Sequence, residues 1–123
     1  MDPSIGAALS HGGVIDITTV GRRTGAPRRI EIVYHVIGGR IYITGMAGRP
    51  RSWLANMVAE PHFTFHLKRG IQADLPAIAT PITDPDERTA IFSEVVKAWT
   101  NQNVPDMLAR SPLVEVTFPD LAA

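Results

Sequence analysis

Cysteine is absent from the 123 residues, which excludes disulfide bonds, thiol catalysis and cysteine-based zinc or iron–sulfur sites. Net charge is absent too, because 12 basic side chains balance 12 acidic ones. A sequence-blind nucleic-acid binder normally carries a basic excess, so no nucleic-acid partner is expected. No apolar run approaches the roughly 20 residues of a transmembrane segment. Residues 1–13 also lack the basic start and apolar core of a signal peptide, and a cytoplasmic protein is expected.

The composition is that of one ordinary folded domain. Hydrophobic residues make up 45% and charged residues 20% of the chain. At this length a second core would leave each half too small to bury one. We expect residues 1–13 to form an N-terminal tail and residues 14–123 to form a single domain of short elements joined by tight turns.

Most of the chain reads as β-strand. β-branched or alternating apolar residues predict strands at 14–20, 28–37, 40–44, 62–68, 71–79 and 113–118. Gly38-Gly39 predicts a hairpin turn, and Pro76 predicts that its strand lies at an edge or carries a bulge. Because no strand–helix–strand alternation occurs, the order favours a small antiparallel barrel with helices covering its open side.

Two main helices are predicted, at residues 52–59 and from Pro85 to about Thr100. Asp84 and Glu87 form a capping box at the start of the second helix. A short helical turn is expected at 106–110. In the first helix the apolar stripe comprises Trp53, Leu54, Met57 and Val58. In the strand that follows it, the inward residues are Phe63, Phe65 and Leu67, and the outward ones are His62, Thr64, His66 and Lys68.

The zero net charge hides an asymmetry. Residues 1–51 carry seven arginines and three acids, a charge of +4, and the remainder carries −4. The seven are Arg22, Arg23, Arg28, Arg29, Arg40, Arg49 and Arg51. Arginine presents a planar fork of donors that suits phosphate and carboxylate oxygens. The cluster indicates either a discrete anionic ligand or an ordinary solvated basic face.

The turn at residues 21–29 concentrates these features. Gly21 and Gly25 allow backbone amides to approach a ligand closely, and Thr24 adds a hydroxyl. Arg22 or Arg23, together with Arg28, could clamp a phosphate from two strands. The Gly-Lys-Ser/Thr ending of a P-loop is missing. The alternative is a basic hairpin turn without a ligand.

A second glycine-containing segment, residues 45–53, joins a strand to a helix. Gly45 and Gly48 expose backbone there, and Ser52 is placed to cap the helix, whose N-terminus favours anions. Small residues beside Trp53 would form a flat slot for an aromatic ring system. The alternative is a plain loop with Trp53 in the core.

No acid, base, nucleophile or metal site stands out, so the catalytic residues stay unknown. His62 and His66 lie about 13 Å apart along one strand, too far to chelate one metal ion directly. No serine lies in a Gly-x-Ser-x-Gly elbow. If the protein is an enzyme, a cofactor is expected to carry its chemistry.

Two blocks resemble the deazaflavin-dependent nitroreductase family, actinobacterial quinone and nitro reductases that use coenzyme F420. Thr18-Thr19-Val20-Gly21-Arg22-Arg23-Thr24-Gly25-Ala26-Pro27-Arg28 is similar to its Thr-Thr-x-Gly-Arg-Lys/Arg-Ser/Thr-Gly-x-x-Arg signature. Residues 53–61 resemble its Trp-Tyr-x-Asn-Leu-x-Ala-Asn-Pro block. The resemblance covers residues 14–118. It departs after Arg28, where the family commonly has proline and this chain has Arg29, which implies a different pocket wall.

The resemblance implies a β-rich α+β fold, a split β-barrel of about six antiparallel strands with two main helices. It implies that Arg22, Arg23 and Arg28 hold the phosphate and glutamate tail of the coenzyme, with Thr24 and Gly25 completing the turn. It places the deazaflavin ring against the backbone of Thr44, Gly45, Met46 and Ala47, with Trp53 and Asn56 beside it. Relatives of this fold occur as monomers and as dimers, so a homodimer is possible.

The implied activity is hydride transfer from reduced F420 to an electron-poor small molecule, a quinone, an enone or a nitro compound. Two alternatives remain open. The same arginines could take the single phosphate of FMN in a split-barrel flavoprotein. The chain could also be a non-catalytic binding protein for a flat anionic ligand such as a deazaflavin or haem.

Overall fold

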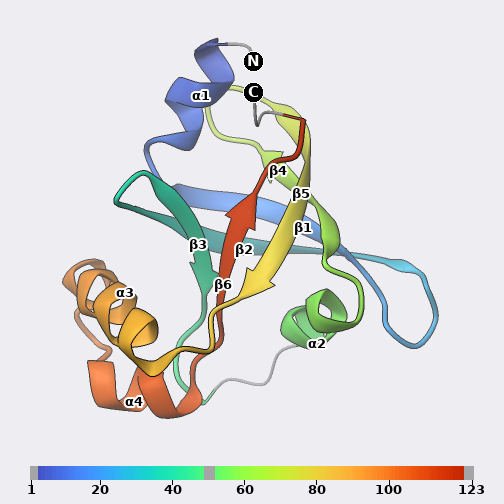
Figure 1. Ribbon diagram of the computed structural model, residues 1–123. Helices are drawn as coiled ribbons and strands as arrows, with labels where there is room; N and C mark the ends of the chain where they lie inside the picture. Colours follow the sequence, from blue (N-terminus) through green and yellow to red (C-terminus); the bar gives the residue numbers. More distant parts are fainter. Residues whose placement is uncertain (1–2, 49–51, 121–123) are drawn as a thin grey trace.

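Six antiparallel strands close into a barrel in a computed structural model that describes residues 3–48 and 52–120 (Figure 1). The strands are β1 (Gly13–Val20), β2 (Pro27–Ile37), β3 (Arg40–Thr44), β4 (His62–Leu67), β5 (Ala73–Pro81) and β6 (Leu113–Thr117). Their order around the barrel is β1-β2-β3-β6-β5-β4, and β4 pairs with β1 to close it. All six predicted strands are confirmed, and so is the antiparallel barrel.

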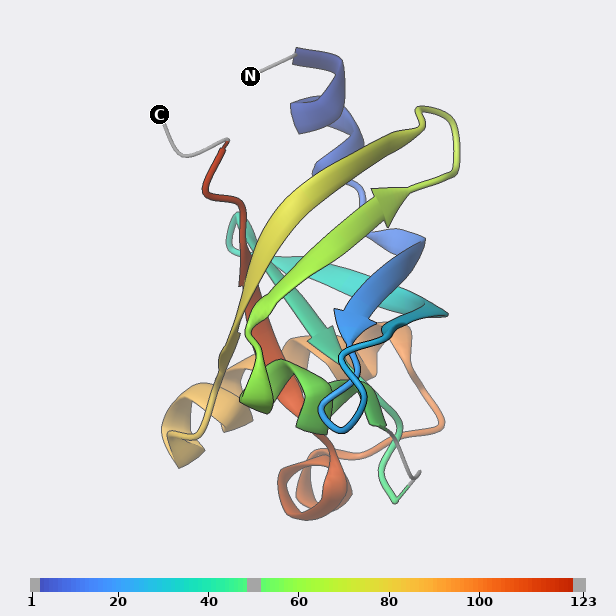
Figure 2. The ribbon, with the colours of Figure 1, turned by 90° about the vertical axis from the view of Figure 1, so that its right-hand side faces the viewer.

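In the part of the chain that the structure describes, four helices lie around this barrel: α1 (Pro3–Leu9), α2 (Ser52–Ala59), α3 (Pro85–Ala98) and α4 (Val104–Arg110). Figures 1 and 2 show α1 at one end of the barrel and the other three helices toward the opposite end. The two main helices are those predicted, and α4 extends the predicted helical turn. The Asp84 carboxylate accepts a hydrogen bond from the Glu87 amide at 2.9 Å, which confirms Asp84 as the N-cap of α3.

Apolar side chains form two buried clusters. One fills the barrel and includes Ile17, Ile43 and Phe65, each of which has no exposed surface. The other lies between the barrel wall and the pair α3 and α4, where Phe92 and Met107 are fully buried. The second cluster fixes the end of α3 against the sheet, and this places Trp99 beside β2 and β3.

The N-terminal segment is helical where we expected a tail. Leu9 of α1 is buried in the barrel cluster, and Ile5 packs against the same cluster. The Tyr34 hydroxyl donates to the carbonyl oxygens of Ala8 and Leu9, at 3.1 and 3.3 Å. The seven residues hold only two large apolar side chains, Ile5 and Leu9, too few for the periodicity to signal a helix.

Three local expectations were wrong. Strand β5 pairs with both β4 and β6 instead of lying at an edge, although Pro76 lies in the part that pairs only with β4. Val58 is 64% exposed, whereas Asn56 of the same helix is buried. His66 was expected to face solvent and is buried, because its imidazole lies between Thr18 and Asp74, at 2.7 and 2.6 Å.

Candidate functional site

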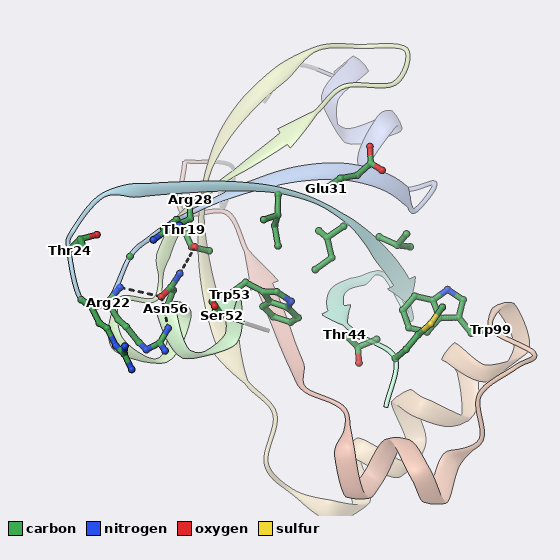
Figure 3. Close-up of a pocket in the computed structure, with 17 residues that line it drawn as sticks. Thr19, Arg22, Thr24, Arg28, Glu31, Thr44, Ser52, Trp53, Asn56 and Trp99 are labelled. Atoms are coloured by element: carbon green, nitrogen blue, oxygen red, sulfur yellow. Dashed lines mark hydrogen bonds between the residues drawn. The ribbon is translucent and has the colours of Figure 1, made fainter. Parts of the chain in front are cut away.

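A cavity of about 710 Å³ opens between the barrel and α2 (Figure 3). Its walls come from the β1–β2 turn, from β2, from the segment after β3, from α2 and from Trp99. Arg22, Thr24 and Arg28 lie at one end, Trp53 lies in the middle, and Thr44 and Trp99 lie at the other end. The cavity is therefore polar and cationic at one end and largely uncharged at the other.

The β1–β2 turn closes on itself through backbone hydrogen bonds. The Gly21 amide donates to the Ala26 carbonyl, and the Gly25 amide donates to the Gly21 carbonyl, both at 2.8 Å. The Thr24 hydroxyl accepts from the Ala26 amide at 3.2 Å. Gly25 has a φ of +73°, which favours glycine. These three amides donate inside the turn and are not available to a ligand. The donors that they leave for an anion are guanidinium groups, not the backbone amides that we expected.

Asn56 connects α2 to this turn. Its side-chain oxygen accepts from the backbone nitrogen of Arg22 at 3.2 Å and from the Arg22 guanidinium at 3.3 Å. Its side-chain nitrogen donates to the Thr19 hydroxyl at 3.0 Å. Asn56 and Thr19 are both buried, so the bond between them is shielded from water. The arrangement orients Arg22 at the cavity mouth.

The arginines of the first half divide into two groups. Arg29 contacts the carboxylate of Asp16 at 3.0 Å, and Arg40 contacts that of Glu115 at 3.7 Å. Within the described residues, the arginines that line the cavity, Arg22, Arg23 and Arg28, form no ion pair. Arg49 and Arg51 lie outside the described residues. Three cations without carboxylate partners thus gather at one end of the cavity, where an anionic group would find donors.

Strand β2 supplies the apolar wall. Ile30, Ile32 and Val33 line the cavity, and Ile30 is 38% exposed although it is a large apolar residue. Glu31, between them, points away from the cavity in Figure 3, and its carboxylate binds Lys68 on the outer face of the barrel. An exposed aliphatic wall favours a ligand with an apolar face.

Most residues predicted for the site line the cavity. They are Arg22, Arg23, Thr24, Arg28, Thr44, Gly45, Met46, Trp53 and Asn56. Gly25 and Ala47 do not line it. The Ala47 amide donates to the side-chain oxygen of Gln102 at 3.1 Å, and the Thr44 hydroxyl donates to the Pro112 carbonyl. These bonds tie the segment after β3 to the C-terminal third of the chain.

Further lining residues were not predicted: Thr19, Gly21, Ile30, Glu31, Ile32, Val33, Ser52 and Trp99. Thr19 and Gly21 belong to the arginine-rich motif, and this signal could have found them. Trp99 gave no such signal, because its spacing from Ile91 and Val95 in the sequence indicates a packing residue. Only the docking of α3 beside β2 brings its indole to the cavity.

His35 lies behind Trp99. The two rings meet edge to face, with centroids 4.9 Å apart and planes at 78°. Burial lowers the pKa of His35 from its usual value. Its Nε2 atom is buried without a hydrogen-bond partner. The uncharged end of the cavity is thus backed by a histidine whose surroundings favour the neutral form.

Other titratable groups gather on the outer face of the barrel. The hydrogen bond from His66 lowers the pKa of Asp74, and the hydrogen bonds from Lys68 and Arg29 lower that of Asp16.

Among the described residues, no group of three potential metal ligands lies together. No helix in the described ranges is long and apolar enough to cross a membrane.

The chain is similar to known proteins in sequence and in fold. The sequence profile of the F420H(2)-dependent quinone reductases matches residues 1–116. An F420-H2 dependent reductase superposes with a TM-score of 0.65 at 19% identity, covering 85% of this chain and 94% of its own. A candidate pyridoxamine 5′-phosphate oxidase from Listeria innocua superposes with a TM-score of 0.68 at 16% identity, covering 94% of this chain and 91% of its own.

A third matched structure is described as a domain-swapped dimer, with a TM-score of 0.60 at 19% identity, covering 85% of this chain and 80% of its own. At these identities the three structures share their fold, the split β-barrel, with this chain.

Proposed function

The chain belongs to the F420H(2)-dependent quinone reductase family, and from that membership we propose that it transfers a hydride from reduced coenzyme F420 to an electron-poor organic acceptor. Quinones, enones and nitro compounds are the acceptor classes. The single observation that supports this most is the cavity itself. It joins three arginines without carboxylate partners to an aliphatic and aromatic wall, which fits a flat ring system carrying an anionic tail.

The anionic tail is assigned to the β1–β2 turn. Arg22, Arg23 and Arg28 would hold the phosphate and the glutamate carboxylates through charge-assisted hydrogen bonds. Asn56 keeps Arg22 oriented before the ligand arrives, so less side-chain freedom is lost on binding. The backbone of Gly21 lies close to the turn, where a Cβ would come within 3.0 Å of the Ala26 carbonyl oxygen. Glycine at this position therefore keeps the turn tight.

The flat ring is assigned to the middle of the cavity, alongside the segment at the end of β3 from which Thr44, Gly45 and Met46 line it. Trp53 is buried at the start of α2, and Ile30 and Ile32 face the cavity from β2. Reduced F420 supplies the hydride when bound. The protein positions the two reactants and keeps their contact partly dry, which lowers the barrier without requiring a titrating side chain.

A fluorescence titration with coenzyme F420, with FMN in parallel, tests this proposal. Saturable binding of F420 at micromolar concentration or below, followed by oxidation of F420H2 on adding a quinone, supports it. Binding of F420 without turnover over quinones, enones and nitro compounds would make the chain a carrier. Binding of FMN alone would retain the fold and change the cofactor. Binding of neither would overturn the proposal.

We further propose that two copies associate, because a structure with the same fold is described as a domain-swapped dimer. Light scattering of the purified protein measures this. A mass of a single chain at every concentration tested would contradict it.

A further inference from the structure

The contact between His35 and Trp99 joins the barrel to the uncharged end of the cavity. His35 belongs to β2, and Trp99 is the C-cap of α3, its amide donating to the Val95 carbonyl at 3.0 Å. The Trp99 carbonyl accepts from the Gln102 amide at 3.0 Å, and the Gln102 side chain holds Ala47. Trp99 is therefore linked to β2 through His35 and to the segment after β3 through Gln102 and Ala47. Its indole is only partly buried, because one part of it lines the cavity.

His35 carries a polar ring atom that packing against Trp99 does not require. Its Nε2 atom is buried with no partner, and an unpaired buried polar atom is costly to a fold. A phenylalanine at this position would keep the edge-to-face contact with Trp99 and leave no polar atom unpaired. An imidazole here costs stability that a packing role alone would not explain.

Among the described residues, no charged group shifts the pKa of His35 toward the protonated form. Tyr42 of β3 lies directly across the strand pair from His35. Burial raises the pKa of the Tyr42 hydroxyl, Glu115 and Glu87 raise it further, and Arg40 lowers it. From α3 the ring facing His35 is the uncharged indole of Trp99. Burial is the cause that lowers the pKa of His35. A protonated imidazole in this place would bury an N–H at Nε2 that has no acceptor, and it would leave the contact to gain one.

We infer that His35 is a positioning residue that holds Trp99 as the end wall of the acceptor pocket while its imidazole is neutral and releases that wall when it is protonated. The inference rests on the proposed function, since it assigns the end of the cavity away from Arg22 and Arg28 to the acceptor. The labelled side chains there are Thr44 and Trp99, which carry no charge (Figure 3). The pocket accordingly selects neutral flat acceptors, and acid conditions loosen it.

The position of the indole can be followed without cofactor or turnover. The chain has two tryptophans, so Trp53→Phe leaves Trp99 as the single emitter. We expect the emission of Trp99 to shift to the red, and its quenching by acrylamide to rise, as the pH falls below 6.5, the ordinary pKa of histidine. Adding His35→Phe should abolish this transition. Far-UV circular dichroism over the same range separates it from unfolding.

Identical pH curves with histidine and with phenylalanine at position 35 would overturn the inference, as would no spectral change in either protein. If Trp53→Phe does not fold, fluorine NMR of the natural chain labelled with 5-fluorotryptophan resolves the two indoles and answers the same question.

The pH dependence of the KM for the acceptor tests whether the position of Trp99 affects acceptor binding. Between about pH 8 and a pH below the midpoint of the fluorescence transition, we expect the KM for a neutral naphthoquinone to rise about three- to tenfold in the natural chain, the size of one lost aromatic contact. In His35→Phe the KM should stay nearly constant, and the affinity for F420 should be equal in both proteins. A KM that rises equally in both proteins would overturn the inference. Loss of F420 binding or of all turnover in the natural chain at about pH 8 would instead refute the proposed function, and the fluorescence transition would still test the His35–Trp99 contact.

Discussion

Asn56 accepts two hydrogen bonds from Arg22 through one side-chain oxygen, at 3.2 Å from the backbone nitrogen and 3.3 Å from the guanidinium. The two residues belong to segments 34 positions apart in the chain. A buried residue of α2 therefore orients the first cation of the β1–β2 turn. This relationship makes the cationic end of the cavity depend on how α2 packs against β1.

Replacing Asn56 tests this dependence. Asn56→Ala removes both bonds to Arg22 and leaves the buried Thr19 hydroxyl without its donor. We expect a loss of about 1–3 kcal/mol in the free energy of unfolding, the cost of unsatisfied buried polar groups. Because Arg22 is no longer oriented, the Kd for F420 should rise by about tenfold. Urea unfolding and a fluorescence titration measure the two effects.

The matched control is Asn101→Ala, since Asn101 is an exposed asparagine outside the cavity. It should change neither quantity. Equal affinity for F420 in Asn56→Ala and in the natural chain would show that the orientation of Arg22 does not contribute to binding.

The arginines without ion pairs should contribute most to ligand affinity. Arg23→Ala and Arg28→Ala each remove one charge-assisted contact, and each should weaken F420 binding by about ten- to a hundredfold. Arg69→Ala makes the same change in charge at an exposed site outside this cavity and should leave the affinity unchanged. If all three variants bind alike, the anionic tail lies elsewhere.

Asp16 should make stability depend on pH in the acid range. Hydrogen bonds from Lys68 and Arg29 hold its pKa below the ordinary 3.8. A carboxylate whose pKa is lower in the folded chain stabilises the fold above its unfolded pKa, and this contribution is lost as the pH falls through its folded pKa. Asp16→Asn should therefore lower the Tm at neutral pH, and its difference from the natural chain should shrink below about pH 3.8.

Thermal unfolding followed by circular dichroism across this pH range measures the difference in Tm. Asp120→Asn, at an exposed residue of the C-terminal turn, is the control and should have no such profile. A constant difference between Asp16→Asn and the natural chain at every pH would contradict the assignment.

Arg88 should stabilise the helical end of the molecule through its fork of donors. Its guanidinium donates to the carbonyl oxygens of Ile82, Ser111 and Leu108, at 3.0, 2.8 and 3.4 Å. It also lies over the Phe92 ring, 5.1 Å from the centroid. Arg88→Lys keeps the charge but cannot reach several carbonyls at once, so unfolding should cost about 1–3 kcal/mol less.

Urea unfolding measures this loss, and Arg69→Lys at an exposed position serves as the control. Binding of F420 should be unaffected by Arg88→Lys, since Arg88 does not line the cavity. Equal stability of the two variants would mean that the backbone carbonyls find other donors.

Local chemistry made much of this fold predictable. β-branched and alternating apolar residues indicated each strand, Gly38-Gly39 indicated the hairpin, and Asp84 indicated the start of α3. The outward orientation of His66 was predictable, but its burial was not, because its partners Thr18 and Asp74 lie on two other strands. The exposure of Val58 was not predicted for a similar reason. The face of α2 that is buried depends on its contacts with β1, where Asn56 donates to Thr19.

The candidate site divides in the same way. The arginine-rich turn, its glycines and the Trp53 block were readable from the sequence, because turn chemistry and helix entry depend on neighbouring residues. Tertiary structure decided which arginines are left without carboxylate partners, that Asn56 orients Arg22, and that Trp99 and His35 close the far end of the cavity. These relationships join residues dozens of positions apart, and only barrel closure and helix docking bring them together. The sequence by itself thus determined the six strands, the two main helices and the cationic turn. Long-range packing decided that α1 docks on the barrel and which residues face the turn.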